Sequence, residues 1–391
     1  MAGRRRTSPA LGPLDDEDLL AEILIRLPPK PSSLPRASLV CRRWRSFATD
    51  AAFRRRFRTH HRRPPILGVF EECARKLKFR PLLDPPDRIP SDRFSLDLSA
   101  YGFFSWSVLG CRHGRVLLLN RTENALLVFE PVSGDTHRIL VPPVFTRDGS
   151  TGASAAVLCA AGDDQDHVHG DCHTSPFMVV MVGTNRRAQV AVARVYYRES
   201  GMWGDLISSA EPCAGYVGHR HCTLVGNALY WCLYGTRDTA DDGILKFDLD
   251  HQSLTVISKP PTGPIDSQIQ IIRGEDGGLG LAILSYPSFQ LWEHMVDCHG
   301  NDTWVPRKTV EMDEMLGRKA DHTHIVGYAE DADAIFMSMH KPLDSDPFRR
   351  VLVIVQLESM KVKNHHGTCD QNTDYHPFTN FYTAGICLSL H

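Results

Sequence analysis

The sequence predicts an α+β multidomain chain in which a small all-α domain is followed by a much larger all-β domain. Three observations lead to this prediction. Apolar residues recur with long helical periodicity within residues 14–58, and the only other helix predicted is a short one near Met312 to Leu316. After residue 65, short β-rich runs alternate with turns of Gly, Asp, Asn and Pro. The charge divides at the same place, because residues 1–63 hold 15 Lys and Arg against 6 Asp and Glu, whereas the whole chain has a formal net charge of −2.

The composition excludes several protein classes. With 42% apolar and 23% charged residues, the 391-residue chain can bury a core and is not disordered throughout. No window approaches the roughly 18 uninterrupted apolar residues of a membrane span. Arg4, Arg5 and Arg6 are not followed by the apolar run of a secretory signal, and the 11 cysteines contain no C-x-x-C pair. We therefore expect reduced thiols and a protein of the cytoplasm, the nucleus or both, without membrane contact.

The first helix is predicted from five apolar residues that share one helix face. They are Leu19, Leu20, Ile23, Leu24 and Leu27. Carboxylates at 15–18 suit a helix N-terminus, and the prolines at 28, 29 and 31 end the helix. Shorter helices are predicted from a Ser32 or Ser33 cap through Val40, around Trp44, and after an Asp50 cap. A unit of this size has a marginal core, and its adjacent apolar pairs cannot all face inward, so a partner surface is expected to cover the excess.

Residues 14–58, which begin LDDEDLLAEILIRLP and continue through Leu39-Val40-Cys41 and Trp44-Arg45, resemble an F-box, particularly those of large plant families. The acidic run after Leu14 is one residue longer than usual. The resemblance implies docking onto a Skp-type adaptor, which bridges to a cullin scaffold in an SCF ubiquitin ligase. By position, the implied adaptor contacts are Leu19, Leu20, Ile23, Leu24, Leu27, Pro28, Leu39, Val40, Cys41 and Trp44. The alternative is that some of these residues only fill the core of the helical unit.

The basic N-terminal region also permits a rival interpretation, a nucleic-acid-binding module. No helix presents Asn, Gln and Arg at base-reading spacing, and Arg54 to Arg63 suit a solvated helix face and linker. Nucleic acid is therefore not the expected partner.

Five hairpins of similar pattern follow, and their central residues are Phe129, Tyr196, Phe247, Trp292 and Val355. The spacings of 67, 51, 45 and 63 residues are typical of propeller blades with insertions. A sixth blade can be assembled from the segment at Ile66, the segment 94–98 and the C-terminal segment 381–390, which would close the ring. The fold prediction is thus a six-bladed β-propeller-like domain, with a β-sandwich as the alternative. This part resembles the β-propeller-like domains of plant F-box proteins. The predicted boundaries are a basic tail 1–13, the F-box 14–58, a linker 59–65 and the propeller 66–391.

One segment offers metal-ligating side chains, at His167, His169, Cys172 and His173 among several aspartates. The spacing H-x-H-x-x-C-H matches no structural zinc pattern. We interpret the segment as an insertion in the second blade, which explains the spacing of 67 residues, and we expect no metal and no cofactor.

The same sequence lacks common catalytic motifs. It has no G-x-S-x-G, P-loop or H-E-x-x-H, and the glycine-rich 274–280 stretch is predicted to be a hairpin turn. An enzyme on a propeller scaffold remains an alternative. The expected function is a non-catalytic subunit that recognises an unknown target for ubiquitination, through residues that the sequence does not assign.

Overall fold

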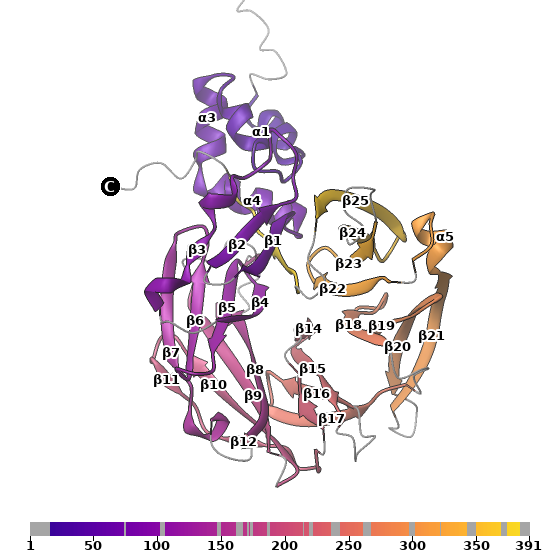
Figure 1. The fold of residues 1–391 in the computed structure, drawn as a ribbon. Helices are drawn as coiled ribbons and strands as arrows, with labels where there is room; N and C mark the ends of the chain where they lie inside the picture. Colours follow the sequence, from indigo (N-terminus) through magenta and orange to yellow (C-terminus); the bar gives the residue numbers. More distant parts are fainter. Residues whose placement is uncertain are drawn as a thin grey trace, which may run out of the picture.

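The computed structural model describes two units, a cluster of helices and a ring of six β-sheets, with the helices at the outer edge of the ring near β1 and β2 (Figure 1). The described residues are 16–383 except for 74–75, 102–105, 147–149, 162–166, 170–171, 173–174, 186–187, 214, 219–221, 236–242, 261–266, 297–301, 321, 342–348 and 369–373. In this part of the chain, no helix is both long enough and apolar enough to cross a membrane.

Four helices form the first unit: α1 (Glu17–Ile25), α2 (Ser33–Ser38), α3 (Arg42–Thr49) and α4 (Ala51–His61). Two predicted caps are present. The Asp16 carboxylate accepts hydrogen bonds from the amides of Asp18 and Leu19, and Asp50 accepts one from Phe53 at 2.6 Å. The helical prediction is confirmed, but α4 ends three residues beyond position 58 because its last turn continues to His61, whose ring contacts Phe57.

The six sheets are antiparallel blades. The first contains β26 (His376–Thr379), β1 (Ile66–Cys73), β2 (Lys76–Pro81) and β3 (Leu96–Asp97), and the second contains β4 (Ser107–Arg112), β5 (Arg115–Asn120), β6 (Ala125–Glu130) and β7 (Asp135–Leu140). The third contains β8 (Ser150–Cys159), β9 (Phe177–Asn185), β10 (Val190–Tyr197), β11 (Met202–Trp203) and β12 (Ile207–Ser208).

The other three blades complete the ring. The fourth contains β13 (Tyr216–Val217), β14 (Thr223–Val225), β15 (Ala228–Tyr234), β16 (Gly243–Asp248) and β17 (Ser253–Ser258). The fifth contains β18 (Gln268–Arg273), β19 (Leu279–Ser285), β20 (Ser288–Val296) and β21 (Asp302–Glu311), and is followed by the predicted short helix, α5 (Met312–Leu316). The sixth contains β22 (His324–Ala329), β23 (Ala334–His340), β24 (Arg350–Gln356) and β25 (Lys361–Thr368).

The ring closes through β26, which pairs with β1 from the other end of the chain. The inner strands of neighbouring blades contact one another around the ring, so none is left as an open edge. The propeller prediction is therefore confirmed and the sandwich alternative is wrong. One detail is corrected: the closing strand is His376–Thr379 rather than the segment from Phe381. Residues 381–383 instead line a pocket with helical residues such as Leu34 and Phe57.

The repeat pattern located the blades correctly. All five hairpin centres named from the sequence lie in the third strand of their blade, in β6, β10, β16, β20 and β24. In the third blade, the inner strand β8 is buried and rich in small residues, and β9 is the second strand. The His- and Cys-rich segment lies between β8 and β9, as an insertion in this blade. This is the blade of the second predicted hairpin, and it is third in the ring because the blade that contains β1 comes first.

Candidate functional site

Six of the ten implied adaptor contacts are exposed on the helical unit: Leu19, Ile23, Pro28, Leu39, Val40 and Cys41. Leu19 and Ile23 are four residues apart on α1, so they share one face of that helix. Leu39, Val40 and Cys41 form the turn between α2 and α3, where Leu39 is 76% exposed and Val40 63% exposed. We call these six residues the exposed apolar set. Large apolar side chains held in water at a helical turn are typical of a docking surface.

The other four implied contacts lie inside or beside the core of the helical unit. Leu20 and Leu24 are fully buried among apolar residues of all four helices, and Leu27 and Trp44 pack partly buried against the same core. A partner that binds the folded unit cannot reach Leu20 or Leu24. These two assignments are corrected, because adjacent positions on α1 point in different directions and only the tertiary packing decides which of each pair faces inward.

The helical unit is fixed to the propeller by polar and apolar contacts. Asp87, in the loop between β2 and β3, accepts hydrogen bonds from the Ser32 amide at 3.0 Å and the Ser32 hydroxyl at 2.7 Å. The Lys30 ammonium lies 3.7 Å from the same carboxylate. Beside these contacts, Phe57 and Tyr382 line a small shared pocket. Sequence reasoning treated the two units as joined only by a linker and missed this junction.

The basic helix α4 divides its arginines between two environments. Arg54 and Arg58 line the junction pocket, whereas Arg55 and Arg56 are exposed to solvent. Arg56 also lies 3.8 Å from Glu22 on α1. Two of the four arginines of α4 therefore face the propeller.

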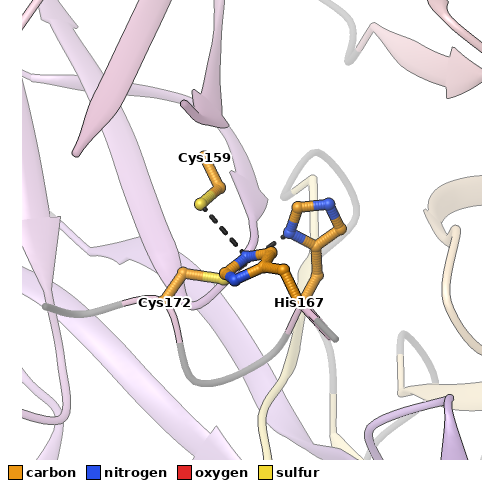
Figure 2. Close-up of side chains that lie close together, drawn as sticks. Cys159, His167 and Cys172 are labelled. Carbon is orange, nitrogen blue, oxygen red and sulfur yellow. Dashed lines mark hydrogen bonds between the residues drawn. The ribbon is translucent and has the colours of Figure 1, made fainter. Parts of the chain in front are cut away.

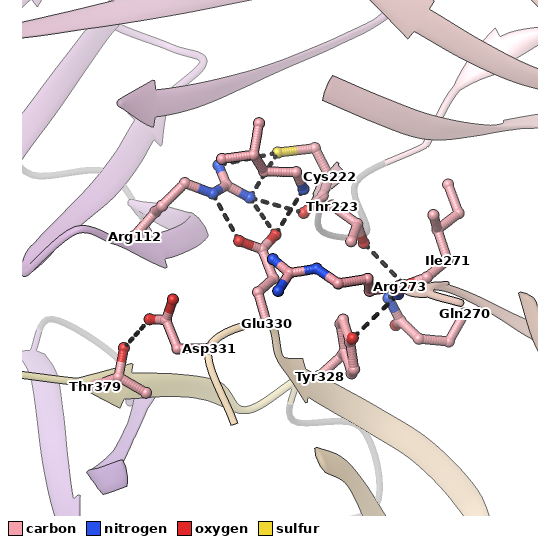
Figure 3. Close-up of polar contacts among 11 residues, drawn as sticks. Arg112, Cys222, Thr223, Gln270, Ile271, Arg273, Tyr328, Glu330, Asp331 and Thr379 are labelled. Carbon is pink, nitrogen blue, oxygen red and sulfur yellow. Dashed lines mark hydrogen bonds and ion pairs between the residues drawn. The ribbon is translucent and has the colours of Figure 1, made fainter. Parts of the chain in front are cut away.

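A network of partly buried polar side chains joins three blades (Figure 3). The Arg112 guanidinium at the end of β4 donates to both oxygens of Glu330, at 2.8 and 2.5 Å, and to the carbonyl of Cys222 at 3.2 Å. Glu330 follows β22 and also accepts from the Leu224 amide at 2.9 Å. Because each partner comes from a different blade, the network stabilises the closed ring.

Burial shifts the pKa of several titratable groups around this network. Burial raises the pKa of the Cys222 and Cys111 thiols, so both stay protonated at neutral pH and neither is an activated nucleophile. Burial also raises the pKa of Asp331, which accepts a hydrogen bond from the Thr379 hydroxyl. The cavity that Arg112 and Glu330 line measures about 40 Å³, far below the size of ordinary substrate pockets.

A wider cleft of about 790 Å³ opens between the fifth and sixth blades. Its lining combines Trp292 with charges of both signs, including an ion pair between Arg307 and Glu293. Exposed tryptophans on the propeller would be suitable anchors for a target. Trp231 is buried, however, and Trp203, Trp292 and Trp304 are half-buried with bonded indole N–H groups. No fully exposed tryptophan anchor is thus found among these four described residues.

The metal-ligating residues singled out in the sequence lie close together at the end of β8. His167, His169 and Cys172 converge there, and His173 lies outside the described residues. They are joined by Cys159, the last residue of β8, which sequence reasoning missed (Figure 2). The available signal was a cysteine at the point where a predicted strand enters the His- and Cys-rich insertion.

A family model described as "F-box protein AT5G49610-like, beta-propeller" matches residues 107–382, and an F-box-like model matches residues 17–60. The chain belongs to this family of F-box propeller proteins. An F-box joined to a propeller fits an SCF substrate-recognition adaptor in general, and such family members are typically non-catalytic. The F-box in general supports binding to a Skp-type adaptor.

Other comparisons add only a distant likeness. A search of curated proteins finds no match. Among solved structures, an oligogalacturonate lyase in complex with manganese is 11% identical, with 77% of each chain covered and a TM-score of 0.37. A post-proline cleaving enzyme from Rickettsia typhi is 10% identical, with a TM-score of 0.32 over 77% of this chain and 43% of its own. At these values, neither match bears on the activity of this F-box protein.

Proposed function

We propose that this F-box protein is the substrate-recognition subunit of an SCF-type ubiquitin ligase of the cytoplasm or nucleus. Its F-box docks on a Skp-type adaptor, the adaptor joins it to a cullin scaffold, and the propeller binds a target protein. The observation that carries this proposal is the exposed apolar set, since the core of the F-box is complete without these residues.

The energetics of the exposed apolar set favour association. Fully burying a leucine or valine side chain contributes roughly 1.5–3 kcal/mol before association costs are subtracted. In the free chain, Leu39 and Val40 are mainly exposed, so most of this free energy of burial is not yet gained. A partner that covers both would recover it, and a Skp-type adaptor is the partner that an F-box supports in general.

The junction at Asp87 supports a positional role for the chain. Because the F-box is held to the propeller by hydrogen bonds, an ion pair and apolar contacts, a target on the propeller would keep a restricted position relative to the adaptor. The chain would thereby raise the effective concentration of the target near the ubiquitin-transferring enzyme. This role requires no nucleophile or general base from the propeller.

The test is co-purification of the full chain with a purified Skp-type adaptor. The double substitution Leu39→Asp with Val40→Asp should abolish capture, since it places two carboxylates in the proposed interface. Leu140→Asp is the matched control, because Leu140 is 70% exposed but lies on the propeller strand β7. Capture of all three proteins to the same extent, or of none, would contradict the proposal.

The same preparations test the nucleic-acid alternative. That alternative predicts salt-sensitive binding of DNA or RNA that is lost when Arg55 and Arg56 are both replaced by alanine. If adaptor capture fails and this binding is seen, the basic helix rather than the exposed apolar set is the functional surface. Proximity labelling in cells, with the full chain and with the Leu39→Asp, Val40→Asp variant, separates two groups of partners. Partners of the exposed apolar set are labelled by the full chain alone, whereas a target on the propeller is labelled by both proteins.

A further inference from the structure

The connection between β8 and β9 brings four side chains with metal-ligating atoms to one point. These atoms are the sulfurs of Cys159 and Cys172 and one ring nitrogen each of His167 and His169, and all lie within 4.8 Å of one another. Figure 2 shows the Cys159 and Cys172 side chains approaching His167 from different sides. Both cysteines are buried. Neither the F-box nor the family match accounts for this cluster.

Three of the separations between these atoms fit a shared tetrahedral ion. Zinc binds sulfur at about 2.3 Å and imidazole nitrogen at about 2.0 Å, so sulfur and nitrogen ligands on one tetrahedral zinc lie about 3.5 Å apart. The His167 Nε2 atom lies 3.4 Å from the Cys159 Sγ and 3.5 Å from the Cys172 Sγ. The His169 Nδ1 atom lies 3.6 Å from the Cys172 Sγ.

Hydrogen bonding alone accounts poorly for this arrangement. A neutral imidazole nitrogen carries either one proton or one lone pair, so it makes one good hydrogen bond. His167 Nε2 nevertheless faces two sulfurs at nearly equal distance. A cation between the three atoms satisfies all of them at once.

The surrounding residues hold the ligands in place. The Cys159 amide donates to His113 Nδ1 at 3.0 Å, and the His113 ring stacks on His169 with centroids 3.7 Å apart. The fully buried Arg115 donates to the Cys172 carbonyl at 2.5 Å and to Glu130 at 2.7 Å. Such outer contacts orient ligands in metal sites, and here they come from the neighbouring second blade.

From this geometry we infer that Cys159, His167, His169 and Cys172 bind one structural zinc ion. Two thiolates and two neutral imidazoles balance the charge of Zn²⁺, so the loaded site is neutral and suits its buried position. Thiolate and imidazole ligands favour zinc over magnesium or calcium, which prefer oxygen. The pattern is C-x7-H-x-H-x2-C, with its first ligand on a strand and the rest in the insertion. The ion fastens the insertion to the end of β8, independently of any ligase function.

The experiment measures metal in the full chain, purified under reducing conditions without an affinity tag that binds metal. Elemental analysis should find one zinc per chain. Replacement of zinc by cobalt should give the visible bands of a tetrahedral site and the near-ultraviolet thiolate-to-cobalt charge transfer. The wild-type cobalt spectrum requires no variant, so it tests the site even where substitutions impair folding.

Variants then identify the ligands. Cys159→Ser with Cys172→Ser should lose at least nine-tenths of the zinc, and His167→Ala with His169→Ala should lose most of it. Cys213→Ser is the matched control, because Cys213 is equally buried but lies outside the cluster, and it should keep one zinc per chain. Chelation should lower the Tm of the wild-type chain and expose residues 160–176 to proteolysis, without changing the Tm of the double cysteine variant.

Four outcomes would overturn the inference. They are less than a tenth of a zinc per chain after reconstitution, a cobalt spectrum without thiolate charge transfer, a Cys159–Cys172 disulfide in place of metal, and equal zinc loss from the Cys213→Ser control.

Discussion

Leu39→Ala should weaken adaptor binding, whereas Leu20→Ala should lower the stability of the F-box, although both leucines were implied as adaptor contacts. Leu39 is 76% exposed, and burying a whole leucine contributes about 1.5–3 kcal/mol, so its truncation should weaken adaptor binding by about 1–2 kcal/mol. That loss corresponds to about a 5- to 30-fold increase in Kd. Since Leu39 contributes little to the core, the free energy of unfolding should stay nearly constant. Leu20 is fully buried, and its truncation should cost about 2–5 kcal/mol of F-box stability.

The assay combines calorimetric titration of each full-length variant with the purified adaptor and a thermal melt of the same sample. Binding is measured at a temperature where the melt shows both variants folded. Leu39→Ala should then bind more weakly with an unchanged Tm, and Leu20→Ala should bind with a nearly unchanged Kd and a lower Tm. The opposite result, in which Leu39→Ala binds like the wild type while folded Leu20→Ala loses affinity, would contradict both assignments, because the adaptor would then contact a rearranged helical unit.

Three further predictions concern the ring. Glu330→Gln leaves Arg112 without its carboxylate partner and should lower the free energy of unfolding, measured with denaturant, by about 3 kcal/mol. An unchanged unfolding midpoint would mean that water already screens this ion pair. Asp331→Asn removes a carboxylate whose pKa is raised by burial. Its ionisation destabilises the folded state only as the pH rises through that pKa, so the variant should have a higher Tm than the wild type at pH 7 and an unchanged Tm at about pH 3. A loss at pH 7 would contradict this. Gly327→Ala would place a Cβ against the Tyr375 carbonyl oxygen, closer than van der Waals contact allows, and should lower the Tm by an amount corresponding to about 1–3 kcal/mol. An unchanged Tm would show that the backbone at this contact can shift.

The sequence by itself determined the elements and their grouping. The Asp16 and Asp50 caps, the prolines after α1 and the leucine periodicity placed four helices, because caps and helical periodicity depend on residues only a few positions apart. The recurring hairpins likewise placed the blades, since each is a local antiparallel unit repeated along the chain.

Only the tertiary structure decided which side chains meet. Leu19 and Leu20 are equivalent in the pattern, yet packing against the other helices exposes the first and buries the second. Arg112 and Glu330 are 218 residues apart and meet because the ring closes. Cys159 reaches the histidines because its strand ends beside the insertion, although its spacing matches no structural zinc motif. Contacts of this kind depend on how strands and blades pack in space, and neither periodicity nor local spacing encodes that arrangement.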